Sequence, residues 1–223
     1  MDPLYRSRYR LVCFDLDGTL VSGLTYVWKS LHEHFRTDAV ARREARRAFH
    51  AGRLPYADWF RHDITLLRAA GARREAVLAL FHTMRPVAGA RETLAALRGA
   101  GARLAVLSGS VDLLLDSALP GERFDHVLIN RLDFDEDGLV AGGVPTEFDV
   151  ERKGEGIREL CRREGIGTAD CAFVGDNEND LSAARTAGFA IAFDCKSPRL
   201  AAAASVVVPG GDLRAVLPHL LEG

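Results

Sequence analysis

The sequence lacks the features that mark membrane, disulfide-bonded and zinc-binding proteins. No apolar stretch approaches the roughly 18 residues that a membrane-spanning helix needs. The four cysteines are far apart and form no C-x-x-C pair, so neither a disulfide framework nor a zinc site is expected, and a reducing cytoplasm is favoured. Neither sign of charge is in excess, with 29 Lys plus Arg against 31 Asp plus Glu. We therefore expect no nucleic-acid partner and no membrane partner.

The chain does have enough apolar residues for a core of its own. Of its 223 residues 48% are hydrophobic, which suits one α/β domain or a core domain with a smaller insertion. Short apolar runs that end in polar or glycine residues predict buried strands at 9–14, 103–107, 171–174, 190–193 and 205–208. Amphipathic stretches predict helices at 88–98, 111–118, 154–163, 179–187 and 212–220. This alternation indicates an α/β fold, a Rossmann-like parallel sheet with helices on both faces.

One long segment breaks the alternation. Residues 22–84 show helical periodicity throughout, and glycine and proline divide them into about four helices. The segment is too long for a loop in a compact domain. We therefore predict a small helical cap domain at 22–86, inserted after the first strand of a catalytic core made of 1–21 and 87–223.

Two groups of cap residues invite a functional interpretation. A basic cluster contains Glu44 and has helical spacing, so it is expected to be a solvated helix face; its members are Arg42, Arg43, Arg46 and Arg47. Trp28 and Trp59 are expected in the cap core, with the alternative that one of them lines a substrate pocket.

Paired carboxylates follow the first predicted strand. Asp15 and Asp17 would share one face of a continuing strand, and such a cluster of carboxylates suits Mg²⁺. In parallel sheets of this type, ligands bind at the carboxyl ends of the strands, which is where both residues lie.

Four motifs in order resemble the signatures of the haloacid dehalogenase-like phosphohydrolases. The first is the hexapeptide Asp15-Leu16-Asp17-Gly18-Thr19-Leu20, and the second is Ser108 with Gly109. Lys153 resembles the third motif. The fourth is the acidic run that begins at Gly175 and contains Asp176, Asn179 and Asp180. Together they span essentially the whole predicted core.

The resemblance implies a role for each of these residues. Asp15 is the expected nucleophile and a ligand of Mg²⁺, and Asp17 is the expected general acid and base, with its backbone carbonyl on the metal. Ser108 and Gly109 would bind the phosphoryl oxygens, and Lys153 would neutralise their charge. Asp176 would complete the metal site, supported by Asn179 and Asp180. The implied substrate is a small-molecule phosphomonoester.

The closest resemblance is to the phosphoserine phosphatase branch, but its substrate-binding charges do not carry over. That branch keeps a glutamate where this chain has Leu24, and a cap arginine where this chain has Asp63. If Asp63 projects over Asp15, it should disfavour carboxylate-bearing substrates and favour neutral or amine-bearing ones. Phosphoserine is therefore not the expected substrate.

Alternatives stay open at this point. The same scaffold supports a phosphotransferase or phosphomutase, or a non-catalytic binding protein. Residues 133–138 open like a calcium-binding loop, but Val144 stands where that loop needs an acidic residue, so a β-hairpin turn at Asp137-Gly138 is expected instead. The sequence does not indicate the oligomeric state.

Overall fold

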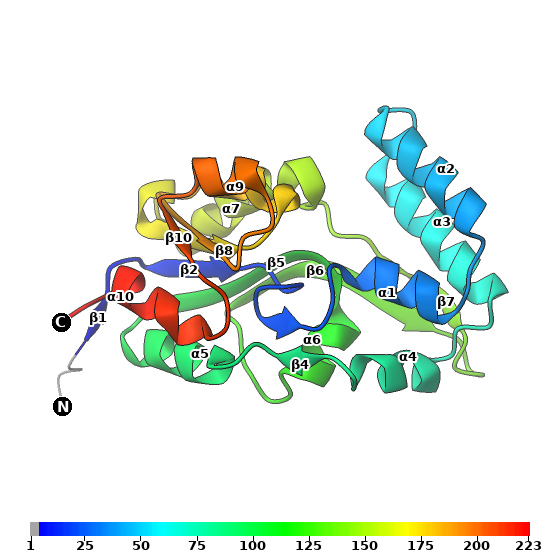
Figure 1. Ribbon diagram of the computed structural model, residues 1–223, viewed down its shortest axis with the longest axis horizontal. Coiled ribbons are helices and arrows are strands. Elements are labelled where there is room, and N and C mark those ends of the chain that lie inside the picture. The colour runs from blue at the N-terminus through cyan, green and yellow to red at the C-terminus, as the bar shows by residue number, and fades with distance from the viewer. Residues whose placement is uncertain (1–4) are drawn as a thin grey trace.

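A seven-stranded sheet forms the centre of the protein in the computed structural model, which describes residues 5–223 (Figure 1). The strands lie in the order β10-β9-β8-β2-β5-β6-β7, and all neighbours are parallel except β7, which is antiparallel to β6. The strands are β2 (Leu11–Phe14), β5 (Arg103–Val111), β6 (His126–Phe134), β7 (Val140–Val144), β8 (Cys171–Gly175), β9 (Phe189–Phe193) and β10 (Val206–Val208). Residues 1–4 of the predicted core segment lie outside the described residues.

Helices cover both faces of this sheet. Figure 1 shows α7 and α9 on one face and α5, α6 and α10 on the other, and α8 packs between α7 and α9. Their bounds are α5 (Ala90–Gly99), α6 (Asp112–Ala118), α7 (Lys153–Glu164), α8 (Leu181–Ala184), α9 (Pro198–Ala203) and α10 (Leu217–Leu220). The predicted α/β architecture with a largely parallel sheet is confirmed. At the edge away from the cap, β1 (Arg6–Ser7) pairs with β11 (Leu221–Glu222).

The central strand β2 is buried on both faces, and its alternating side chains join two separate clusters. Leu11 and Cys13 pack with the α7 side of the core, whereas Val12 and Phe14 pack with the larger cluster on the other face. Burying a side chain of this kind contributes about 1.5–3 kcal/mol relative to leaving it exposed. Cys13 is a free buried thiol that packs as a small hydrophobic residue.

Two short strands mark the limits of the predicted cap. β3 (Val21–Ser22) pairs antiparallel with β4 (Arg85–Pro86). Between them lie α1 (Val27–His34), α2 (Ala39–His50), α3 (Tyr56–Ala69) and α4 (Arg74–Phe81). In Figure 1, α2 and α3 run side by side; α3 packs against β7 at the edge of the sheet, while α1 packs against β5 and α4 against α6. We keep the term cap for residues 22–86.

Several elements differ from the sequence prediction for local reasons. The expected helix 179–187 is a 3₁₀ turn, η3 (Glu178–Asp180), followed by the short α8, because the Asp180 side chain is engaged with backbone N–H groups before the turn. The expected helix 212–220 is also split, and Pro218, which has no N–H to donate, lies in the first turn of α10. The predicted hairpin turn at Asp137-Gly138 does join β6 to β7. Within the described residues, no helix is both long and apolar enough to cross a bilayer.

Candidate active site

Asp15 lies directly after the central strand β2. The two neighbouring strands, β5 and β8, therefore end close to it. β2 pairs in parallel with β5 and with β8, and the backbone N–H of Asp15 donates to the Val174 carbonyl of β8 at 2.9 Å. The carboxyl ends of the three strands therefore meet at one edge. Ser108 comes from β5 and Asp176 from the residue after β8.

Lys153 connects two of the predicted carboxylates. Its Nζ donates to Asp15 Oδ1 at 2.7 Å and to Asp180 Oδ1 at 2.6 Å, and its side chain has no exposed surface. Burial acts to lower the pKa of Lys153, but the charges of Asp15, Asp180 and Asp149 outweigh that effect and the net pKa is raised. Lys153 is therefore a fixed positive charge beside Asp15.

Asp180 positions both the lysine and the turn after β8. Its Oδ2 accepts from the backbone N–H groups of Asp176 and Asn177, at 2.8 and 3.1 Å. Burial and the neighbouring Asp15 raise the pKa of Asp180 to about 6. Asn179, the other predicted supporting residue, lines the cavity described below.

Asp176 completes a cluster of buried carboxylates. One oxygen each of Asp15, Asp176 and Asp180 lies within 4.8 Å of the others. Burial, followed by the charges of Asp15 and Asp180, raises the pKa of Asp176 to about 8, although Lys196 Nζ lies 2.6 Å from its Oδ2. A side chain at Gly18 would place its Cβ 2.3 Å from the same oxygen, so glycine is needed there.

This donor set fits a hard divalent cation. Mg²⁺ prefers carboxylate and carbonyl oxygens, and the cluster supplies buried carboxylates that Lys153 and Lys196 do not fully neutralise. Burial is the main cause of the upward pKa shift of Asp176, and the negative charges of Asp15 and Asp180 add to it. Asp15 and Asp176 fit the cation better than Asp180, because a lysine engages only one oxygen of each, whereas both oxygens of Asp180 accept hydrogen bonds.

Asp17 has a different environment from the other carboxylates. Its Oδ2 accepts from the backbone N–H of Val27 at 2.6 Å, and its buried Oδ1 has no hydrogen-bond partner among residues 5–223. Burial, with Asp15 as the next contribution, raises the pKa of Asp17 to about 7. A carboxyl group with a pKa in this range can both give and take a proton near neutral pH.

The second motif sits where β5 departs from regular pairing. The β5–β6 register shifts between Leu107 and Val111, and Ser108 and Gly109 lie in that interval. The Gly109 carbonyl accepts from Trp28 Nε1 at 2.8 Å and from Asn130 Nδ2 at 2.7 Å. Asn130 is fully buried, and its Oδ1 accepts from the Thr146 backbone at 2.8 Å. Sequence reasoning did not identify Asn130, because its partners are distant in the chain.

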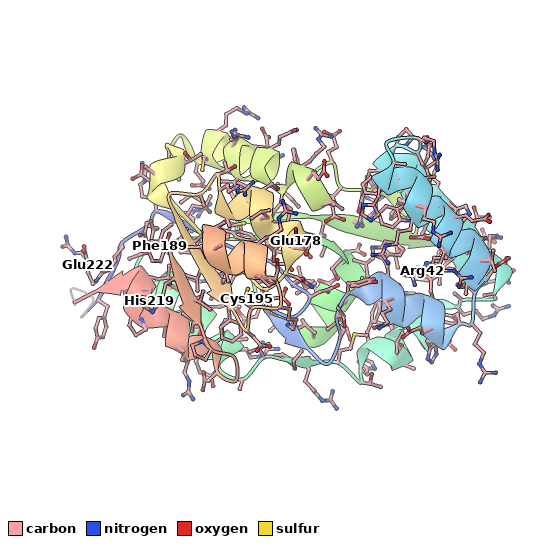
Figure 2. The ribbon with its side chains drawn as sticks, turned by 45° about the horizontal axis from the view of Figure 1, so that its top comes forward. Arg42, Glu178, Phe189, Cys195, His219 and Glu222 are labelled. Atoms are coloured by element: carbon pink, nitrogen blue, oxygen red, sulfur yellow. The ribbon has the colours of Figure 1, made fainter. Side chains whose placement is uncertain are left out.

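One cavity of about 670 Å³ lies at this edge of the sheet, and Lys153 and Asp180 are buried and do not line it. Its floor contains Asp15, Asp17, Ser108, Gly109 and Asp176. Its cap side includes Trp28 and Trp59, in line with the alternative that a tryptophan lines the pocket. Figure 2 labels Arg42 on α2 and Glu178 in η3, two residues that line this cavity from the cap and from the core.

The basic cluster of α2 is largely exposed, as expected of a solvated helix face, but two of its members also line the cavity. Arg42 and Arg46 line the cavity together with His50, at spacings of four residues along one side of the helix. Arg42 is half-buried and Arg46 is exposed, whereas Arg43 and Arg47 are exposed and do not line the cavity. The spacing of Arg42, Arg46 and His50 is visible in the sequence. Which side of α2 faces the cavity, however, depends on how α2 packs on α3.

Asp63 is not placed over Asp15, and the expectation built on that position is corrected here. Its Oδ1 lies 3.2 Å from His32 Nε2, and both side chains are buried between α1 and α3. Asp63 borders a separate space of about 30 Å³ and does not line the main cavity. Leu24 is partly buried against the hydrophobic core and does not line the cavity either. Neither residue presents a charge to a bound substrate.

Comparisons with known proteins agree with this geometry. A family model described as haloacid dehalogenase-like hydrolase matches residues 9–188. A phosphoserine phosphatase of Methanocaldococcus jannaschii is 30% identical over 212 residues, which cover 95% of this chain and 97% of that protein. One from Halobacterium salinarum is 33% identical over 192 residues, 83% of this chain and 86% of that one.

Solved structures show the same similarity. A substrate-bound phosphoserine phosphatase complex superposes with a TM-score of 0.76 at 28% identity, covering 95% of this chain and 98% of the other. A structure described as a phospho-aspartyl intermediate analogue of phosphoserine phosphatase superposes with a TM-score of 0.73 at 28% identity, covering 95% and 99%.

Proposed function

Since this chain belongs to the family of haloacid dehalogenase-like hydrolases, we propose that it is a magnesium-dependent phosphatase that hydrolyses a small-molecule phosphomonoester through a phosphorylated Asp15. The observation that carries the proposal is that Asp15, Asp17 and Ser108 line one cavity, and that the buried Lys153 places its Nζ 2.7 Å from Asp15 Oδ1.

In the first step, the Asp15 carboxylate attacks phosphorus, and the bond from phosphorus to the leaving oxygen breaks. The protonated Asp17, whose pKa is raised to about 7, gives its proton to that oxygen, so the leaving group departs as an alcohol. Lys153 stays protonated and offsets negative charge on the transferring group, while Ser108 and the amides around Gly109 contact its oxygens.

In the second step, ionised Asp17 takes a proton from a water molecule that attacks the phosphorus of the aspartyl-phosphate. The bond between phosphorus and Asp15 breaks, phosphate leaves, and Asp17 is protonated again for the next cycle. Mg²⁺, when bound, neutralises charge on the phosphoryl oxygens and orients them for in-line attack. Asp15, Asp176 and the Asp17 backbone carbonyl are the groups that we assign to it.

We further propose that phosphoserine is not the preferred substrate. The resemblance implies a glutamate and a cap arginine for the amino and carboxylate groups of phosphoserine, and this chain has Leu24 and Asp63 at those positions. Neither lines the cavity, and the cap residues (22–86) that do line it include Arg42 and Arg46 but no acidic side chain, so the cap offers the ammonium group of phosphoserine no counter-charge. The relatives named phosphoserine phosphatases make phosphoserine the reference compound for any substrate panel.

Release of phosphate from p-nitrophenyl phosphate tests the proposed activity. The purified protein should turn over with Mg²⁺, lose turnover in EDTA, and regain it when Mg²⁺ is restored. Asp15→Asn should abolish turnover under the same conditions. Phosphate passed mainly to added alcohols instead of water would favour the phosphotransferase alternative. Full activity of Asp15→Asn would show that Asp15 is not the nucleophile.

A further inference from the structure

The cap carries positive charge on the side of the cavity opposite the reacting carboxylates. Arg42 and Arg46 line the same cavity as Asp15 and Ser108, but they come from α2 and not from the core. Arg42, Arg46 and His50 lie at successive intervals of four residues, so the stripe runs roughly 12 Å along the helix at 1.5 Å per residue. It is long enough to meet a group well removed from the scissile phosphate.

Carboxylates of the protein do not neutralise these two arginines. Among residues 5–223, neither Arg42 nor Arg46 lies within ion-pair distance of an acidic side chain. Arg199, on the core side of the cavity, does pair with Glu178. The guanidinium groups of α2 therefore keep their hydrogen-bond donors for an anion from outside the chain.

The cavity also has more room than a minimal substrate needs. Its volume of about 670 Å³ falls within the roughly 300–1,000 Å³ of pockets that enclose drug-sized ligands. A phosphoryl group held at Asp15, Ser108 and Lys153 leaves the rest of the space to its leaving group. Trp28 and Trp59 line that part from the cap and supply apolar surface.

We propose that Arg42 and Arg46 form a second anion-binding site, and that the substrate is a phosphomonoester whose leaving group carries a second anionic group, phosphate or carboxylate, at its far end. The proposal rests on the proposed phosphatase function and specifies its substrate class. It replaces the expectation of neutral or amine-bearing substrates, which depended on Asp63 facing the pocket.

Matched pairs of probes test the anion requirement. Fructose 1,6-bisphosphate is compared with fructose 6-phosphate, 3-phosphoglycerate with glycerol 3-phosphate, and phosphoserine and p-nitrophenyl phosphate serve as references. In at least one pair, the substrate with the anionic leaving group should have a kcat/KM about tenfold or more above that of its neutral counterpart. A difference within the fructose pair would identify the second anionic group as a phosphate, and a difference within the glycerol pair would identify it as a carboxylate. Equal values within both pairs would overturn the proposal.

Charge-removing variants locate the effect on α2. Arg42→Gln combined with Arg46→Gln should lower the preference for the anionic member of the responding pair about tenfold, mainly through KM. Arg43→Gln combined with Arg47→Gln removes the same charge from the solvent side of the helix and should leave the preference unchanged. Equal effects of the two double variants would indicate a general electrostatic effect of α2 and would contradict a specific anion-binding site at Arg42 and Arg46.

Binding measured by calorimetry separates this inference from the proposed activity. Fructose 1,6-bisphosphate and 3-phosphoglycerate are titrated in Mg²⁺ into Asp15→Asn, which should not hydrolyse them, and into its variant that also carries Arg42→Gln and Arg46→Gln. The Kd of the preferred ligand should rise about tenfold in the variant. If wild type hydrolyses no probe, including p-nitrophenyl phosphate, the proposed phosphatase function fails. If the protein hydrolyses a probe but replacing Arg42 and Arg46 changes neither the kcat/KM preference nor the Kd, only the anion-binding site is refuted.

Discussion

The Asp17 carboxylate accepts a hydrogen bond from the backbone N–H of Val27 at 2.6 Å, and thereby joins the loop after β2 to the first helix of the cap. Val27 begins α1, and that N–H is one of those that a helix leaves without an internal partner. The same side chain keeps Oδ1 free of hydrogen bonds among the described residues. One oxygen thus attaches the cap, and the other is available for the proton transfer that we propose for Asp17.

Asp17→Asn separates these two roles. The amide oxygen still accepts from Val27, so the melting temperature should stay within a few degrees of wild type, while kcat should fall about 100-fold or more because the amide cannot exchange a proton. Asp17→Ala should lose turnover and also about 1 kcal/mol of stability, since the helix end loses its acceptor. Turnover of Asp17→Asn close to wild type would exclude Asp17 as the acid and base.

Lys153 and Arg152 are adjacent cations with opposite surroundings, which makes them a matched pair. Lys153 is buried between Asp15 and Asp180, whereas Arg152 is exposed and pairs with Glu155. Lys153→Met should lower kcat by about 100-fold or more and destabilise the fold by roughly 3 kcal/mol, because it leaves buried carboxylates without their counter-charge. Arg152→Met should change stability by less than about 1 kcal/mol. Similar effects of the two substitutions on kcat and on urea unfolding would contradict these assignments.

Stability of the metal-free protein should depend on pH through the buried carboxylates. The pKa of Asp176 is raised from 3.8 to about 8, so the folded state binds this proton more tightly than the unfolded state. The resulting stabilisation is complete below the unfolded pKa and is lost as the pH rises from 3.8 toward 8. Asp17, raised to about 7, has the same sign.

In EDTA, the protein should therefore be at least about 1 kcal/mol less stable near pH 8.5 than near pH 5. Asp176→Asn should flatten this dependence and stabilise the metal-free protein at the higher pH, and it should weaken the stabilisation that added Mg²⁺ gives to wild type. Thermal unfolding across the pH series, with and without Mg²⁺, measures all three effects. Stability that rises with pH over this range would contradict the assignment.

The Asp63–His32 pair should stabilise the cap and have little influence on substrate choice. Its groups lie 3.2 Å apart and are buried between α1 and α3. Asp63→Asn should lower the melting temperature while leaving the order of kcat/KM values across a substrate panel the same. A substantial reordering of that panel would restore Asp63 as a specificity residue.

The sequence predicted the core residues of the candidate active site better than the cap residues that line its cavity. Asp15, Ser108 and Asp176 each follow an apolar strand, and parallel pairing places such positions together whatever the details of packing. No comparable rule predicts which cap residues face the cavity. Whether Arg42 or Arg43 faces the cavity depends on the rotation of α2 about its axis. Asp63 and His32 are 31 positions apart (63 − 32), on separate helices, so their pairing was not predicted.

Phosphorylation of Asp15 itself provides the most direct test of the proposed chemistry. Wild-type protein is mixed with p-nitrophenyl phosphate and Mg²⁺, quenched in acid during turnover, digested, and its peptides are analysed by mass spectrometry. We expect one phosphoryl group on the peptide that contains Asp15, formed within the turnover time, and none in Asp15→Asn. A phosphoryl group on another residue, or continued turnover by Asp15→Asn, would contradict Asp15 as the nucleophile.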